Sequence, residues 1–145
     1  MLRHEAGHYL VGYLLGVPVA GYTLALGKEH TDFAEARLSR RLIEGKLSDD
    51  ELNALAVVAM AGLAAEGLEY EEVLGQTADL MLLQRLMMRA ETKLTDQQQQ
   101  NLTRWATFEA TRMLKEQGPA YERLMAAMRR GGSVRECLEA IEGRS

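Results

Sequence analysis

The chain has 145 residues, of which 47% are hydrophobic and 26% are charged, and its formal net charge is −4. This length fits one domain with one hydrophobic core, and the composition is too apolar for a disordered chain. The acidic balance and the 6% aromatic content argue against the basic, aromatic-rich surface that nucleic acid requires, so we expect no nucleic-acid partner.

Nothing in the chain predicts membrane insertion or export. The longest apolar run, residues 54–65, is shorter than the roughly 18 residues that span a bilayer. Charged residues occupy positions 3–5, where a signal segment would begin. Cys137 is the only cysteine, so no disulfide forms within the chain. We therefore expect the cytoplasm or the stroma or matrix of an organelle.

The first third of the chain predicts a helix, a strand and a loop. Residues 2–15 form an amphipathic to fully buried helix, which Gly16 and Pro18 end. The β-branched and aromatic stretch 19–26 predicts a short strand. The polar, weakly periodic stretch 28–46 is expected to be a loop, with some helix at residues 34–44.

Capping boxes then mark the starts of three helices, because a Ser or Thr is followed three positions later by Glu or Gln. The pairs are Ser48 with Glu51, Thr95 with Gln98, and Ser133 with Glu136. Thr77 is expected to cap a fourth helix, and Pro119 to lie in the first turn of a fifth, closed by Gly131 and Gly132. The expected helices cover residues 49–68, 78–93, 96–117, 119–130 and 134–142.

These elements predict a mainly α fold with one small β element, in one domain over residues 1–145. Residues 1–93 would hold the functional core, and residues 94–145 would form C-terminal helices. Apolar side chains at helical spacing are expected to fill the core, including Cys137 and six methionines. The methionines are Met81, Met87, Met88, Met113, Met125 and Met128.

Residues 4–8 read His-Glu-Ala-Gly-His, an H-E-x-x-H pattern on the first predicted helix. Residues four apart lie on one helix face, so the imidazoles of His4 and His8 can close on one zinc ion. Glu5 can then reach a water molecule on that metal and act as general base without binding the metal. The alternative without a metal site is an exposed first turn with ordinary surface histidines. The apolar remainder of the helix argues against this alternative.

The sequence resembles the peptidase domain of the FtsH family, the ATP-dependent zinc proteases of peptidase family M41, whose active-site helix reads H-E-A-G-H. Residues 61–66 are similar to the family's A-A-E helix, residues 75–80 to its T-G-A-x-x-D-L segment, and residues 121–136 to its closing helices. The resemblance covers nearly the whole chain. It implies a zinc endopeptidase in which Asp79 is the third metal ligand.

The third ligand also has support from the sequence, with rivals. Asp79 lies 71 positions after His8, far enough for the chain to return, although a first-turn aspartate is favoured by the helix dipole without any metal. Glu66 and Glu69 are the rivals, since thermolysin-like enzymes use a glutamate. We prefer for Glu66 the role of orienting a ligand histidine by a hydrogen bond.

Two further sequence features bear on substrate. The expected strand could pair with an extended peptide, which makes Thr23, Leu24 and Ala25 candidate substrate-binding residues. His30, in the polar loop, is expected to be solvated rather than part of the site.

The chain also departs from the FtsH pattern. It begins three residues before His4, without the family's ATPase module and membrane anchor, and its Gly-Lys pairs at 27–28 and 45–46 do not match a phosphate-binding loop. We expect an ATP-independent peptidase that cleaves peptides or unfolded segments. The alternatives are a non-catalytic metal-binding or interaction domain that works with a separate ATPase, and a piece of a longer protein. By resemblance, a homo-oligomer, a hexamer in that family, is also expected.

Overall fold

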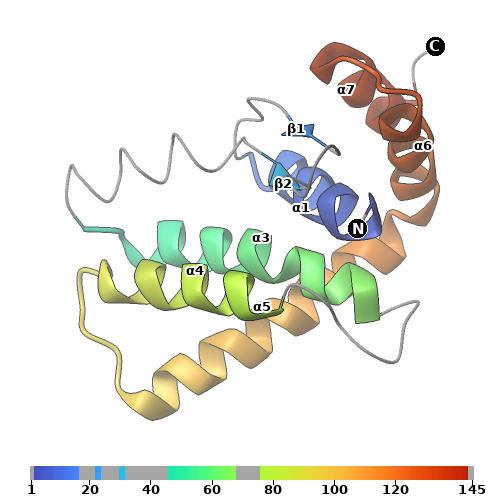
Figure 1. Ribbon diagram of the computed structural model, residues 1–145. Coiled ribbons are helices and arrows are strands. Elements are labelled where there is room, and N and C mark those ends of the chain that lie inside the picture. Colours follow the sequence, from blue (N-terminus) through green and yellow to red (C-terminus); the bar gives the residue numbers. More distant parts are fainter. Residues whose placement is uncertain (1, 17–21, 24–29, 32–45, 68–75, 144–145) are drawn as a thin grey trace.

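A computed structural model describes residues 2–16, 22–23, 30–31, 46–67 and 76–143 (Figure 1). Its described part is mainly helical, as predicted, with one two-stranded sheet. The helices are α1 (Leu2–Leu14), α3 (Asp49–Gly67), α4 (Gln76–Met88), α5 (Asp96–Glu116), α6 (Gly118–Arg129) and α7 (Val134–Glu142). No helix among these residues is long and apolar enough to cross a bilayer.

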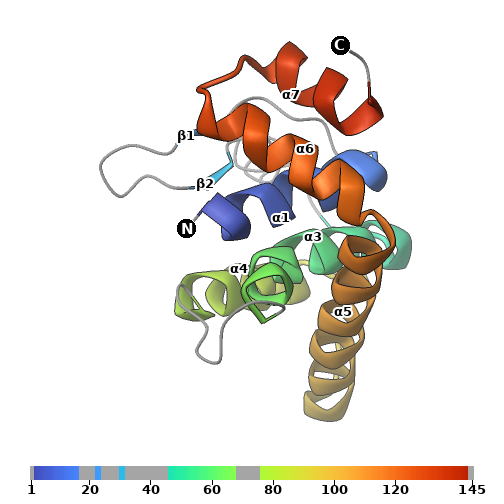
Figure 2. The ribbon, with the colours of Figure 1, turned by 90° about the vertical axis from the view of Figure 1, so that its right-hand side faces the viewer.

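Helix α1 lies in the middle of the protein, with α3 on one side and α6 on the other (Figure 2). All nine residues from His4 to Gly12 are buried, as expected for a helix that is covered on every face. Two tyrosine hydroxyls link it to the C-terminal helices. Tyr121 donates to the Arg3 carbonyl oxygen at 2.8 Å, and Tyr9 donates to the Val134 carbonyl oxygen at 3.2 Å.

Helix α3 is the second structural centre, because α1, α4 and α5 all pack against it. It is rich in small and apolar residues, and twelve of its residues are buried. Its close packing with α1 and α4 brings together the two regions that carry the candidate metal ligands.

The small β element is a hairpin-like pair of strands. β1 (Tyr22–Thr23) runs antiparallel to β2 (His30–Thr31), with Tyr22 opposite Thr31 and Thr23 opposite His30. The strand predicted at 19–26 is confirmed at these two positions, and its other residues lie outside the described part. The loop prediction is wrong at residues 30–31, because they pair with β1. The helix expected at residues 34–44 lies outside the described residues.

Helix α4 differs from its predicted bounds of 78–93. It begins at Gln76, so Thr77 lies inside the helix rather than before it. It ends five residues early, because the next backbone groups form a parallel bridge with Leu47. The Leu47 amide donates to the Arg89 carbonyl oxygen at 2.6 Å, and the Glu91 amide donates to the Leu47 carbonyl oxygen at 2.9 Å. The sequence does not show that these backbone groups bond to Leu47 instead of continuing the helix.

The three predicted capping boxes are confirmed. In each box the Ser or Thr hydroxyl accepts a hydrogen bond from the backbone amide of the Glu or Gln three residues later. The side chain of that Glu or Gln accepts one from the backbone amide of the Ser or Thr, and all six distances are 2.8–3.2 Å. Helices α3, α5 and α7 therefore begin where the sequence places them. Gly131 adopts a left-handed φ of 73° after α6, as its predicted closing role requires.

The core prediction holds for Cys137 and for most of the methionines. Met87, Met113, Met125 and Met128 are buried, together with Cys137. The prediction is wrong for Met81 and Met88, which are 49% and 82% exposed. These two residues are seven positions apart on the face of α4 that no other described helix covers.

Candidate metal centre

Three polar side chains that are distant in sequence meet between α1 and α4. Nε2 of His4 and Nε2 of His8 lie 3.1 Å apart. Oδ2 of Asp79 lies 3.1 Å from Nε2 of His4, and Oδ1 of Asp79 lies 3.5 Å from Nε2 of His8. The structure thus places a carboxylate at two imidazoles one helical turn apart, and this buried group could hold a metal ion.

The buried polar side chains of the described residues form a short set. They are His4, Glu5, His8, Glu66 and Asp79. His4, Glu5 and His8 are 6%, 1% and 8% exposed, so the alternative of an exposed first turn is wrong. Three carboxyl groups and two imidazoles removed from water need compensation, which pairing or a bound cation supplies.

Helix α3 orients both imidazoles through contacts to their Nδ1 atoms. Nδ1 of His4 lies 2.7 Å from Oε1 of Glu66, and Nδ1 of His8 lies 2.7 Å from the carbonyl oxygen of Val58. A carbonyl oxygen can only accept, so Nδ1 of His8 carries its proton, and Nδ1 of His4 donates in the same way to Glu66. In each neutral ring the lone pair is then on Nε2, the atom that faces Asp79.

The spacing of the two imidazole nitrogens is close to that around a tetrahedral metal. A Zn–N bond of about 2.0–2.1 Å gives a ligand-to-ligand edge of roughly 3.3 Å. The two Nε2 atoms lie 3.1 Å apart, and each has a different oxygen of Asp79 beside it, Oδ2 at 3.1 Å from His4 and Oδ1 at 3.5 Å from His8. Oδ2 of Asp79 is also buried without a well-aligned hydrogen bond. Two imidazoles and one carboxylate are a donor set that suits zinc and leaves a fourth position for water or substrate.

Contacts within the site shift the pKa values of two of the candidate ligands, Asp79 and His4. Burial works to raise the pKa of Asp79, but the hydrogen bonds and charges of His4 and His8 outweigh it and lower that pKa to about 2. Burial works to lower the pKa of His4, but the contacts of Asp79 and Glu66 outweigh it and raise that pKa. A cation at this position is therefore favoured electrostatically, whether it is a proton or a metal.

The three candidate ligands are placed by two different helix features. His4 and His8 lie on one face of α1 because they are four residues apart. Asp79 lies in the first turn of α4, where the positive end of the helix dipole favours a carboxylate. Glu66 contacts the far side of the His4 ring, which is the orienting position predicted for it rather than a ligand position. Glu69, the other rival ligand, lies outside the described residues.

The remaining predicted site residues are placed less fully. Glu5 is buried next to His4 in α1, and its role as general base stays a prediction. Thr23 lies in β1 opposite His30, and β2 packs against α1. Leu24 and Ala25 lie outside the described residues, so peptide pairing along this strand also stays a prediction.

Sequence reasoning did not find the Val58 contact. A backbone carbonyl leaves no signal in the residue type, so only the packing of α3 on α1 reveals that acceptor. It also gave no separate role to Gly62, which lies between Val58 and Glu66 on α3. A glycine inside a helix is the signal that could have drawn attention to this position.

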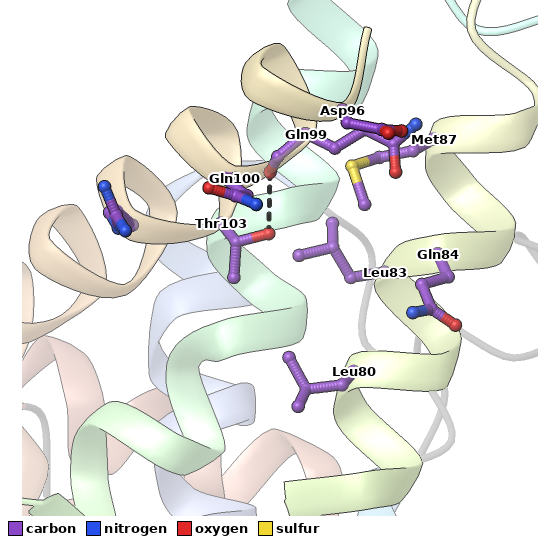
Figure 3. A pocket seen from close by; sticks show the side chains of 9 residues that line it. Leu80, Leu83, Gln84, Met87, Asp96, Gln99, Gln100 and Thr103 are labelled. Atoms are coloured by element: carbon purple, nitrogen blue, oxygen red, sulfur yellow. Dashed lines mark hydrogen bonds between the residues drawn. The ribbon is translucent and has the colours of Figure 1, made fainter. Parts of the chain in front are cut away.

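A separate hollow of about 430 Å³ opens between α4 and α5 (Figure 3). Its sides include Leu80, Leu83 and Met87 from α4 and Gln99, Gln100 and Thr103 from α5. None of the five buried polar residues lines it. The hollow is therefore distinct from the candidate metal centre.

The chain was compared with models of protein families, with curated proteins and with solved structures, and none of the three comparisons gave a match. The candidate metal centre therefore has only its own geometry and chemistry as evidence of function.

Proposed function

We propose that this protein is a zinc-dependent endopeptidase, with Zn²⁺ held by His4, His8 and Asp79 and with Glu5 as general base. The observation that carries the proposal is the convergence of both Nε2 atoms on the Asp79 carboxylate, with each Nδ1 already bonded to α3. This preorganisation is typical of a metal centre, because the ring orientations and tautomers are fixed before the metal binds. The resemblance of residues 4–8 to the FtsH active-site helix supports the same assignment.

The chemistry is divided among a few groups. Zn²⁺, when bound, supplies Lewis-acid activation of water and of a peptide carbonyl. Glu5 takes the proton of the attacking water and later delivers a proton to the leaving amine, as a general base and then a general acid. Glu66 and the Val58 carbonyl hold the imidazoles in place. The substrates we propose are peptides and unfolded protein segments, since cleavage needs an extended chain at the site.

The proposal is tested by zinc content and casein hydrolysis of the wild type and of Glu5→Gln. The wild type should bind one equivalent of zinc and cleave casein. Glu5→Gln should keep the zinc and lose activity by about 10² to 10⁴-fold, the usual contribution of a general base. Glu122→Gln is the matched control, because Glu122 is an exposed carboxylate on α6.

Each outcome selects one reading. Zinc binding with no hydrolysis in the wild type would favour the alternative, a non-catalytic metal-binding domain that works with a separate ATPase. No zinc binding at all would overturn the metal centre itself. The size of the native particle in solution tests the homo-oligomer separately.

A further inference from the structure

One face of α3 carries three positions, four residues apart, that all point to the metal centre. The Val58 carbonyl bonds to His8, and the Glu66 carboxylate bonds to His4. Gly62 lies midway between them. A Cβ built on Gly62 would lie 2.4 Å from Nε2 of His4, 2.5 Å from Cε1 of His4 and 2.6 Å from Nε2 of His8.

These separations are far below ordinary van der Waals contact, so any side chain at position 62 would collide with both metal-binding nitrogens. Contacts on other sides of the two rings restrain them. Each is held on its Nδ1 side by a 2.7 Å hydrogen bond to α3, and the rings themselves lie in edge-to-face contact with centroids 4.8 Å apart. Moving either ring breaks one of these contacts or moves Nε2 away from Asp79.

No other feature of the helix explains a glycine here. Gly62 lies in the interior of the nineteen-residue helix α3 and is not among the glycines with positive φ. Alanine would favour the helix more than glycine does. A glycine, which favours the helix less than alanine does, thus stands where the backbone of α3 comes close to both imidazoles.

We infer that Gly62 is a positioning residue of the metal centre: its missing side chain lets both Nε2 atoms converge at ligand spacing while α3 still holds both Nδ1 atoms. The inference rests on the proposed metal site and deepens it. Gly62 itself touches neither metal nor substrate in this scheme. It acts through the placement of His4 and His8.

The first test compares Gly62→Ala with Gly67→Ala by zinc affinity, measured by competition with a chelator of known affinity. Gly67 is on the same helix, and a Cβ there would meet nothing within 4 Å. Gly62→Ala should weaken zinc binding at least about tenfold, as changes around a metal's ligands commonly do. Gly67→Ala should leave the affinity unchanged. An unchanged affinity in folded Gly62→Ala would overturn the inference.

The second test needs no metal and works even if Gly62→Ala is poorly folded. The urea midpoint is measured in chelator for Gly62→Ala in the wild type and in a His4→Ala/His8→Ala background. The substitution should lower the midpoint in the wild type and leave it equal or higher in the background without imidazoles. The same change in both backgrounds would show that the Cβ meets something other than the rings, and would overturn the inference.

The two tests separate this inference from the proposed function. A wild type that binds no zinc contradicts the metal centre, while the metal-free comparison still decides whether Gly62 makes room for the imidazoles. Zinc binding that is insensitive to Gly62→Ala contradicts the positioning role and leaves the metal centre standing.

Discussion

Glu66 and Asp79 contact opposite sides of the His4 ring: Oε1 of Glu66 lies 2.7 Å from Nδ1, and Oδ2 of Asp79 lies 3.1 Å from Nε2. The two acids therefore have different relations to a metal bound at Nε2. Asp79 faces Nε2, where a metal would bind, whereas Glu66 would act only through the imidazole. This difference separates the two residues that the sequence left as competing third ligands.

The two acids should accordingly have unequal effects on zinc affinity. Glu66→Ala removes only the acceptor behind His4, and we expect a loss of about 10 to 100-fold. Asp79→Ala removes a ligand, so its loss should exceed about 100-fold, beyond the range of an orienting group. Chelator competition measures both, with Glu122→Ala as an exposed control. A larger loss for Glu66→Ala would make Glu66 the ligand.

The pairing of the two candidate ligands on α1 could be predicted from sequence because it depends on local geometry. Spacing within one helix fixes how His4 and His8 face each other, and capping boxes fix where α3, α5 and α7 begin. Both features lie within a few residues of chain. The resemblance to a known family added the distant aspartate, which spacing alone left open.

The features that sequence did not predict depend on contacts between segments. The end of α4 is set by the bridge between Leu47 and Ala90, which lie 43 positions apart. The Val58 acceptor is a backbone atom, which any residue type would provide. The exposure of Met88 depends on which face of α4 its neighbours cover. The type of a residue says little about which distant segment it will contact.

The metal-free protein should show a distinctive pH dependence. The pKa of Asp79 is lowered from an ordinary 3.8 to about 2, so its stabilising contribution is present above pH 3.8 and lost as the pH falls towards 2. The pKa of His4 is raised above 6.5, so its contribution is present below pH 6.5 and lost as the pH rises through the raised value. Asp79 and His4 therefore both contribute fully to stability between about pH 4 and 6.5.

Urea unfolding of chelator-treated wild type and Asp79→Asn should reveal this window. At pH 5.5 the wild type should be more stable by about 2 kcal/mol, the equivalent of the lowered pKa of Asp79. The gap should shrink as the pH is increased from 5.5 through the raised pKa of His4, because a neutral imidazole gives the Asp79 carboxylate no positive charge. Glu66 is present in both proteins and does not contribute to the difference. A gap that stays equal across this whole pH series would show that the charge of His4 does not stabilise the Asp79 carboxylate.

The crossing of α1 and α3 gives a prediction about stability rather than metal binding. A Cβ on Gly7 would lie 2.7 Å from the Ala61 carbonyl oxygen and 2.8 Å from the Ala65 Cβ. The Ala61 oxygen is a backbone atom of α3, and the Ala65 Cβ is fixed to that backbone. Neither atom can therefore rotate away from the new methyl group. Gly7→Ala should therefore force the helices apart and destabilise the protein by about 1–3 kcal/mol, as overpacking usually does.

This result would run against helix propensity, which favours alanine over glycine by roughly 1 kcal/mol. Urea unfolding in chelator measures the effect of Gly7→Ala without any contribution from bound metal. Gly67→Ala is again the control, and because its Cβ would meet open space, it should keep or raise the stability. If Gly7→Ala were as stable as Gly67→Ala, α1 and α3 would not cross at the closeness described. The placement of His4 and His8 against Gly62 would then lose its structural basis, since the same crossing brings those rings to α3.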